Sequence, residues 1–345
     1  MESKERVLTV LDHRESDRVP IQAWFVPQLK RALEQKYGAP DDDLYVLLGN
    51  DILSVTFGMS TGFYKEDSPS YVDDYGITYK NTGVYTELAG HPLDTDEKAW
   101  RFVPPPVNRD AIVSKTKRLI ERYGRTHAIA GKINQTLFES SWMLRGLERF
   151  LMDLIEDPEL ADHLMTKMME HHLEIGKVLV ASGVDIVYTG DDVGTQRGMS
   201  ISPELFRKML KPKYAYLWGE LKKINPGVKI AHHTCGNVAP IVPDYIEAGL
   251  DILNPIQPKA MNGAELKSKY GRHLCFWGGM DIQETLPFGR REDIFREVRD
   301  RMKTLGPGGG FIIAPAHNIQ IDTSVENVES FYEAARQFGK YPIRI

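Results

Sequence analysis

The sequence predicts a (β/α)8 TIM barrel, and three observations support this fold class. Eight short β-rich runs, each bounded by Gly, Pro or Asp, are spread along the 345 residues. Segments between these runs have the apolar spacing of helices. Strand and helix therefore alternate, as they do in parallel sheets covered by helices. A doubly wound sheet is the alternative, because a sequence does not show whether a sheet closes.

The predicted strands follow one another along most of the chain, at residues 18–25, 51–57, 127–133, 185–189, 228–235, 251–256, 273–277 and 310–314. Helical spacing is clearest in residues 144–180 and 292–305. The phrase Ser202-Pro203-Glu204 predicts a helix start, since a capping hydroxyl precedes a proline in the first turn. We expect residues 1–345 to form a single barrel domain.

One region departs from this alternation. Residues 61–107 are rich in Asp, Tyr, Gly and Pro, and they end in a run of three prolines. Within them, residues 71–76 and 79–85 are typical of hairpin strands. We expect a β-hairpin-rich insertion after the second strand that acts as a lid or as the contact of a homodimer. A loop without a function is the alternative.

The composition is typical of a globular protein of the cytoplasm. Hydrophobic residues make up 42% of the chain and charged residues 26%, and no apolar run is long enough to span a bilayer. The charged N-terminus lacks the apolar core of a signal peptide. The net charge of −5, without a stripe of Lys and Arg, argues against nucleic acid as a partner. We therefore expect a cytoplasmic protein without a membrane contact.

A His-x-Cys pair stands at the end of the fifth predicted strand. His233 and Cys235 are two residues apart and would point to the same face of a strand. Imidazole and thiolate are ligands that zinc prefers, and a catalytic zinc takes three protein ligands. His317 fits the third place best, and the other candidates are Asp191, Asp192, Asp281 and Glu139. A hydrogen-bonded core histidine beside a buried thiol is the alternative for the pair.

Polar residues also follow the other predicted strands, and in a barrel they would surround one mouth. Asp191, Asp192 and Asp281 are the candidate catalytic residues, which would bind a cationic group or transfer a proton. Candidate substrate-binding residues at the same mouth are Trp24, Trp142, Gln257, Trp277 and Gly279. The second cysteine, Cys275, lies in the middle of a strand, so we expect it to be buried core.

Four phrases of the chain together resemble the uroporphyrinogen decarboxylase superfamily. They are Asp17-Arg18-Val19-Pro20-Ile21, Ser202-Pro203-Glu204-Leu205-Phe206-Arg207, His233-Thr234-Cys235-Gly236-Asn237 and Trp277-Gly278-Gly279-Met280-Asp281. They occur in the family's order and cover nearly the whole chain. The resemblance implies a (β/α)8 barrel, in agreement with the strand count, and either of two activities: porphyrinogen decarboxylation or cobalamin-dependent methyl transfer.

The decarboxylase branch matches this chain poorly. Its members carry a Met-Arg-Gln-Ala-Gly-Arg run after the first strand, whose arginines hold the carboxylates of the substrate, whereas residues 22–28 here contain no arginine. Its Tyr-x-x-Glu-Gly phrase is replaced by Trp142-Met143-Leu144-Arg145-Gly146. Without those arginines, the carboxylates of a porphyrinogen substrate would lack positively charged partners. Asp51 does match the decarboxylase aspartate, so we take it as shared scaffold or a reused substrate-binding group.

The methyltransferase branch is similar to this chain through His-x-Cys-Gly, whose histidine and cysteine ligate zinc, with a further cysteine near the eighth strand. Here His317 holds that last place. The resemblance therefore implies zinc on His233, Cys235 and His317. It also implies that a methyl group passes between a small-molecule donor or acceptor and a cobalamin carried by a partner corrinoid protein. The alternatives are a metal-free decarboxylase or lyase and a non-catalytic ligand- or corrinoid-binding barrel.

Overall fold

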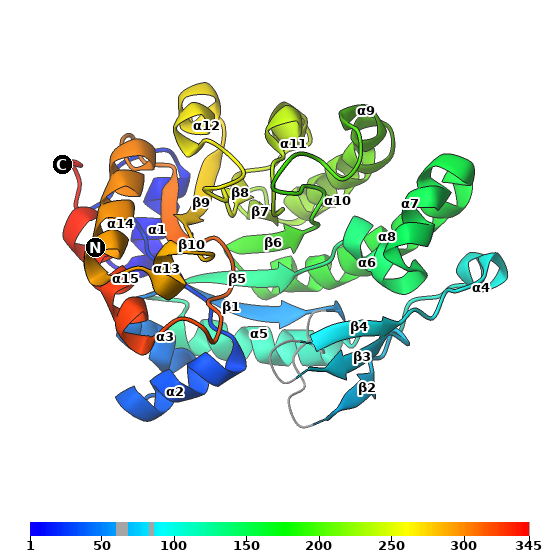
Figure 1. Cartoon of the computed structure of the whole chain (residues 1–345), viewed down its shortest axis with the longest axis horizontal. Helices are drawn as coiled ribbons and strands as arrows, with labels where there is room; N and C mark the ends of the chain where they lie inside the picture. The colour runs from blue at the N-terminus through cyan, green and yellow to red at the C-terminus, as the bar shows by residue number, and fades with distance from the viewer. Residues whose placement is uncertain (60–67, 83–85, 345) are drawn as a thin grey trace.

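The computed structural model describes residues 1–59, 68–82 and 86–344, and within them seven parallel strands form one curled sheet (Figure 1). In sheet order the strands are β1 (Ile52–Phe57), β5 (Ala128–Ile133), β6 (Ile186–Gly190), β7 (Lys229–His233), β8 (Ile252–Asn254), β9 (Cys275–Met280) and β10 (Phe311–Pro315). Because the sheet order is the chain order, each crossover places a helix on the outer face. Seven of the eight predicted strands are confirmed.

The helices cover the outside of this sheet (Figure 1). Helices that follow the strands on this outer face are α5 (Arg109–Tyr123), α8 (Pro158–Ser182), α10 (Lys211–Ile224), α11 (Val242–Glu247), α12 (Gly263–Tyr270), α14 (Arg291–Leu305) and α15 (Val325–Phe338). The others are α1 (Ser3–Leu11), α2 (Pro27–Tyr37), α3 (Asp42–Leu48), α4 (Asp96–Trp100), α6 (Phe138–Arg145), α7 (Leu147–Glu156), α9 (Pro203–Leu205), α13 (Thr285–Phe288) and the short turns η2 (Phe206–Leu210) and η3 (Ala239–Ile241). Within the described ranges, no helix is long and apolar enough to cross a bilayer.

Residues 18–25 do not form the regular first strand that the sequence predicts. The segment runs extended along β10, where the Ile313 N–H donates to the carbonyl of Pro20 at 3.0 Å. On its other side, the side-chain amide of Asn50 bonds both the N–H and the carbonyl of Ala23, at 3.1 and 2.9 Å. The segment thus makes hydrogen bonds next to both edge strands of the sheet, β1 and β10. However, Pro20 has no N–H to donate, and the side chain of Asn50 replaces the backbone of a strand as the partner of Ala23. The predicted ladder is interrupted for that reason.

The insertion after β1 contains a three-stranded antiparallel sheet, formed by β2 (Ser70–Val72), β3 (Thr78–Asn81) and β4 (Thr86–Gly90). Asp73 makes the turn between β2 and β3, because its carboxylate accepts the N–H groups of Tyr75 and Ile77, each at 2.9 Å. Hairpin strands are therefore confirmed for this region. The parts of the predicted insertion at 61–67 and 83–85 lie outside the described residues.

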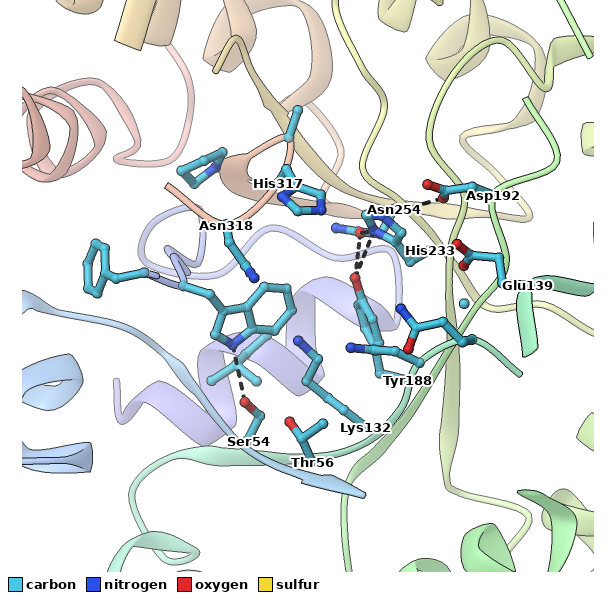
Figure 2. Close-up of a pocket in the computed structure, with 18 of the residues that line it drawn as sticks. Ser54, Thr56, Lys132, Glu139, Tyr188, Asp192, His233, Asn254, His317 and Asn318 are labelled. Carbon is cyan, nitrogen blue, oxygen red and sulfur yellow. Dashed lines mark hydrogen bonds and ion pairs between the residues drawn. The ribbon is translucent and has the colours of Figure 1, made fainter. Parts of the chain in front are cut away.

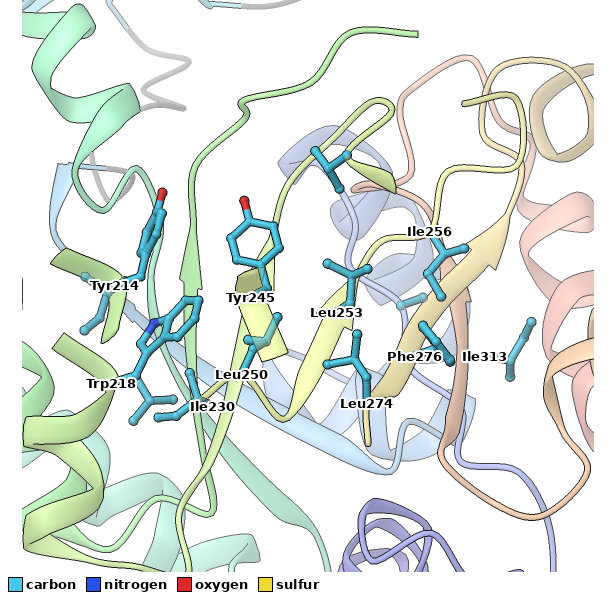
Figure 3. Close-up of a cluster of buried hydrophobic side chains, with 14 of the residues drawn as sticks. Tyr214, Trp218, Ile230, Tyr245, Leu250, Leu253, Ile256, Leu274, Phe276 and Ile313 are labelled. Atoms are coloured by element: carbon cyan, nitrogen blue, oxygen red, sulfur yellow. The ribbon is translucent and has the colours of Figure 1, made fainter. Parts of the chain in front are cut away.

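The main core lies between the sheet and its helices. Figure 3 shows part of it, where Tyr214 and Trp218 of α10 and Tyr245 of α11 pack toward the sheet beside Leu253 and Phe276. Side chains from alternate strand positions form a second cluster inside the curled sheet, which includes Ile52, Ala130, Tyr188, Ala231, Ile252, Trp277 and Ile312. This interior cluster packs inside the curled sheet, and the cavity described below lies toward the carboxyl ends of the strands.

Candidate functional site

A cavity of about 630 Å³ opens at the carboxyl ends of the strands. Its walls come from β1, β5, β6 and β7, from the loop after β10 and from Leu88 of the insertion. Figure 2 shows how the labelled polar side chains converge on this space. The lining includes two of the predicted substrate-binding residues, Trp24 and Trp142. It also includes ionisable side chains, among them Lys132, Glu139, Asp192, His233 and His317. Cavities of this size and mixed lining are typical of small-molecule sites.

Three potential metal ligands meet at one wall of the cavity. One ligand atom each from Asp192, His233 and Cys235 all lie within 4.8 Å of one another. The Cys235 Sγ is 3.3 Å from the Nε2 of His233, which in turn is 3.7 Å from an Asp192 carboxylate oxygen. Nitrogen, sulfur and oxygen ligands in this number match a catalytic zinc site, which keeps its fourth position for substrate. The set therefore fits the metal that the sequence predicts.

Two glycines bring these ligands together. Gly236 has φ +83°, and a Cβ on it would stand 2.4 Å from the carbonyl carbon of Gly194. The loop after β6 and the loop after β7 thus pack backbone against backbone. In this arrangement the Cys235 N–H donates to the Asp192 carboxylate at 2.7 Å. The close approach places Asp192 beside the His-x-Cys pair.

A hydrogen-bond network fixes the ring of His233. Its Nδ1 lies 2.5 Å from the Oδ1 of Asn254, and that oxygen also accepts the Tyr188 hydroxyl at 2.7 Å. The Asn254 amide nitrogen donates to the carbonyl of Trp277, which establishes the oxygen as the side facing the ring. An oxygen can only accept, so Nδ1 carries the proton and Nε2 presents its lone pair to Cys235 and Asp192. Sequence reasoning missed Asn254 and Tyr188, whose only signal is a polar residue near a strand end.

Two acidic groups of the site hold their protons tightly. Burial raises the pKa of the Cys235 thiol well above its ordinary value, and the charges of Asp192 and Glu139 add to the effect. Burial likewise raises the pKa of Glu139, again with help from the neighbouring Asp192 and Asp191 carboxylates. Figure 2 places Glu139 next to Asp192 on the same wall. A cation bound among these groups would relieve their mutual repulsion.

His317 lies near the cluster without belonging to it. It lines the cavity from the loop after β10, and its ring centroid is 5.9 Å from that of His233. The third place beside His233 and Cys235 is taken by Asp192, which the sequence analysis ranked below His317. The reason is the contact between the two glycine loops, which no spacing in the sequence reveals. A ligand role for His317 stays a prediction.

The other two predicted catalytic aspartates lie outside the cavity lining. Asp191 is fully buried, and its carboxylate accepts the N–H groups of Leu137 and Glu139 and the hydroxyl of Tyr214. Burial raises the pKa of Asp191 to about 7 despite these bonds. Asp281 accepts three backbone N–H groups at the start of α13. Both carboxylates accept hydrogen bonds from loop backbone, so in this structure they stabilise the loops around the cavity.

The predicted substrate-binding residues divide into two groups. Trp24 and Trp142 line the cavity. Trp277 is fully buried under Trp24, with ring centroids 5.4 Å apart, and Gln257 accepts the Gly236 N–H at 2.8 Å. Both lie behind the cavity wall and support its lining.

Gly279 and Asp51 are farther away. A Cβ on Gly279 would point at Leu305 and Arg301 of α14, away from the cavity. Asp51 lies directly before β1, at the opposite end of the sheet, and is fully buried. Its carboxylate accepts hydrogen bonds from Arg6 and Arg18 at 2.6 to 3.0 Å. The carboxylate of Asp51 is therefore paired with two arginines at a distance from the cavity.

Lys132 is a cavity residue that the sequence analysis missed. It is the last residue but one of β5, is 7% exposed, and lines the cavity floor. Its Nζ lies 3.4 Å from the ring centroid of Trp24 and 4.9 Å from that of Tyr188. Burial lowers the pKa of Lys132 to about 7. The only signal in the sequence is a single lysine in an otherwise apolar run.

The second cysteine is remote from this site. Cys275 is buried at the other end of the sheet, where its Sγ lies 3.6 Å from the carbonyl of Leu11. Burial raises the pKa of its thiol to about 12. The prediction that Cys275 is core is confirmed.

Comparisons with known proteins agree with the resemblance seen in the sequence. The uroporphyrinogen decarboxylase of Nostoc punctiforme (strain ATCC 29133 / PCC 73102) is 21% identical over 255 residues, which are 72% of this chain and 69% of that protein. That of Trichodesmium erythraeum (strain IMS101) is 23% identical over 182 residues, and the match spans about half (49%) of its length.

A solved structure of a methyltransferase from Methanosarcina mazei shares the fold. Its TM-score is 0.77 at 21% identity, and the match covers 98% of this chain and 99% of that one. The family model described as uroporphyrinogen decarboxylase (URO-D) matches residues 87–338, a region that contains the Asp192, His233 and Cys235 cluster. Since this match extends over well more than half of the sequence, the chain belongs to the uroporphyrinogen decarboxylase family.

Proposed function

We propose that this protein is a zinc-dependent methyltransferase, which moves a methyl group between a small molecule and a corrinoid carried by a partner protein. The observation that carries this proposal is the cluster of Asp192, His233 and Cys235 at the wall of the cavity. The Nε2 of His233 lies 3.3 Å from the thiol of Cys235, which places two ligands that zinc prefers side by side. The shared fold of the Methanosarcina mazei methyltransferase is consistent with it.

Zinc held by these three side chains would supply a Lewis acid, which lowers the pKa of a thiol acceptor or polarises the heteroatom of a methyl donor. The chain prepares this place through Asn254, which keeps the proton of His233 on Nδ1. Partners of this kind set both the orientation and the basicity of a ligating imidazole.

Glu139 is placed to manage the proton of the reaction. If a methyl group left a heteroatom of the substrate, that heteroatom would need a proton, while a corrinoid on the partner protein would supply the methyl-accepting chemistry. Glu139 lines the cavity beside Asp192, and burial raises the pKa of its carboxyl well above the ordinary value, so that in its protonated form it would donate that proton. In the opposite direction it would accept the proton of a thiol.

The aromatic wall would exclude water from the reacting group. Trp24 and Trp142 line the cavity, with Trp142 one turn after Glu139 on α6, and Leu88 of the insertion also contributes to the lining. A corrinoid would approach through the open side at the carboxyl ends of the strands, where the insertion would act as a lid. Removal of water prevents hydrolysis and strengthens the electrostatic contacts inside.

Porphyrinogen decarboxylation, the activity in the names of the two relatives described above, fits this cavity less well. In the described part of the chain no arginine lines it, and its two lysines are Lys30 and Lys132. Lys30 already pairs with Glu34 and Asp41. A polycarboxylate would therefore bring several charges to one available cation, and such burial is costly.

Metal analysis combined with methyl transfer tests the proposal. Purified protein is expected to contain about one zinc per chain, and Cys235→Ala is expected to lose it, whereas the remote Cys275→Ala serves as the matched thiol control. Methylated corrinoid offered with candidate thiols, or reduced corrinoid offered with candidate methyl donors, should change its visible spectrum only with zinc-loaded protein. Stoichiometric zinc that survives Cys235→Ala, or methyl transfer by metal-free protein, would sink the mechanism.

A further inference from the structure

We infer that Lys132 is an anion-binding residue, so that the small-molecule substrate carries a carboxylate at the end opposite its reacting atom. The position of the carboxylate relative to the reacting atom rests on the proposed function. The anion site itself is argued from the surroundings of Lys132 alone. It concerns the floor of the cavity, whereas the ligand cluster lies at one wall (Figure 2).

Lys132 is a buried cation without an acidic partner in the described residues. The residue is 7% exposed, and among the described residues no carboxylate lies within ion-pair distance of its ammonium group. Its Nζ makes cation–π contacts with the rings of Trp24 and Tyr188, whose centroids are 3.4 and 4.9 Å away. Aromatic faces compensate only part of the desolvation of an ammonium group. The geometry thus leaves a positive charge that a ligand has to complete.

The groups around this ammonium are hydrogen-bond donors suited to an oxyanion. Ser54 and Thr56 of β1 line the same floor, and Thr56 is the direct strand partner of Lys132. The Ser54 Oγ accepts the indole N–H of Trp24 at 3.1 Å, so the hydroxyl hydrogen remains to donate. Asn318 reaches into the same region from the loop after β10 (Figure 2). Ammonium, hydroxyl and amide groups together match the acceptors of a carboxylate.

Two of the three acids that line the cavity, Glu139 and Asp192, lie on another wall, and the third, Asp42, comes from the start of α3. Glu139 and Asp192 are drawn together near His233 in Figure 2, and the lowered pKa of Lys132 has burial as its sole cause, without a contribution from either carboxylate. The site therefore separates a cationic floor from an acidic, metal-ligating wall. A substrate with an anionic end and a reacting heteroatom would match both.

Tyr188 sets the length of such a substrate. Its ring faces the Lys132 ammonium, while its hydroxyl lies 2.9 Å from Nδ1 of His233. One tyrosine side chain thus spans from the cationic floor to the imidazole of the cluster. A molecule with only a few bonds between its carboxylate and its heteroatom would reach both places.

Binding of 3-mercaptopropionate and of its neutral counterpart 3-mercaptopropan-1-ol, measured by calorimetry, tests the anion site. Wild-type protein should bind the carboxylate about 10-fold or more tightly than the alcohol. Lys132→Met should abolish this preference, and Lys132→Arg should retain part of it. Lys115→Met removes an exposed lysine that lies over the Phe57 ring outside the cavity, so it should leave the preference intact.

The same measurement on Cys235→Ala separates the two proposals. The carboxylate preference should persist in this variant, because Lys132 lies apart from the ligand cluster. If the anion site is real and the metal site is not, zinc should also have no effect on thiol binding by the wild-type protein, and Cys235→Ala should bind both ligands as the wild type does. Thermal unfolding of each variant establishes that it is folded before binding is measured. Equal affinity for both ligands in folded wild-type protein, or an unchanged preference in folded Lys132→Met, would overturn the assignment.

Discussion

Gly236 stands so close to Gly194 that a Cβ on Gly236 would lie 2.4 Å from the Gly194 carbonyl carbon. This contact between the loops after β6 and β7 brings Asp192 to His233 and Cys235. We predict that Gly236→Ala separates the loops and weakens zinc binding at least about 10-fold, because the ligands lose their common frame. Zinc affinity by chelator competition provides the measurement.

A matched control for this change is Gly249→Ala. Gly249 also has a positive φ, +99°, but a Cβ on it would meet no atom within 4 Å. Both substitutions therefore carry the cost of left-handed backbone, about 1–2 kcal/mol, and only Gly236→Ala adds the clash. Equal zinc affinity in the two variants would contradict the role of the loop contact.

Asn254 offers a second prediction, because its oxygen holds the proton of His233 on Nδ1. Asn254→Leu removes the acceptor while it keeps the size of the side chain. We expect metal affinity to fall by about 10- to 100-fold, with the ligands themselves intact. Asn254→Asp, which keeps the acceptor, should retain most of the affinity. If leucine and aspartate variants bind zinc alike, the hydrogen bond does not orient the ring.

The choice between Asp192 and His317 as third ligand is open to a direct comparison. The structure brings the Asp192 carboxylate to the pair and leaves the His317 ring 5.9 Å from that of His233. We predict that Asp192→Ala loses most of the bound zinc, whereas His317→Ala retains it. Cobalt substitution gives a spectroscopic check, since loss of a ligand changes the visible bands of a tetrahedral site. The reverse order of effects would assign His317 as the ligand.

The sequence predicted those features that depend on local pattern. Strands β1 and β5 to β10 were visible as apolar runs, and the His233–Cys235 pair was visible from its spacing. The proximity of Asp192 to this pair was not visible in the sequence, because it depends on a backbone contact between two loops that lie about 40 residues apart in the chain. Asn254 and Lys132 were missed because their roles depend on neighbouring strands: Lys132 faces Tyr188 only through the register of β5 and β6. Pattern locates the site, and tertiary register decides which side chains complete it.

Lys132 also predicts a pH dependence of stability. Burial lowers its folded-state pKa to about 7, below the ordinary value of 10.5, so the folded protein releases this proton before the unfolded chain does. Between about pH 7 and pH 10.5 the unfolded state binds more protons, and this residue's contribution to stability therefore rises with pH. Below pH 7 the residue carries its full penalty. Lys132→Met removes the penalty, so we expect the variant to be more stable than wild type at pH 6.

The difference in unfolding free energy between wild type and Lys132→Met should shrink from pH 6 to pH 10, because other groups titrate equally in both proteins. Chemical denaturation of both proteins across this range, without ligand, measures it. A saturating carboxylate ligand should reverse the order at pH 6, since it binds only the folded protein and pairs with the protonated amine. A difference that stays constant with pH would mean that Lys132 keeps an ordinary pKa and is solvated or paired in the folded protein.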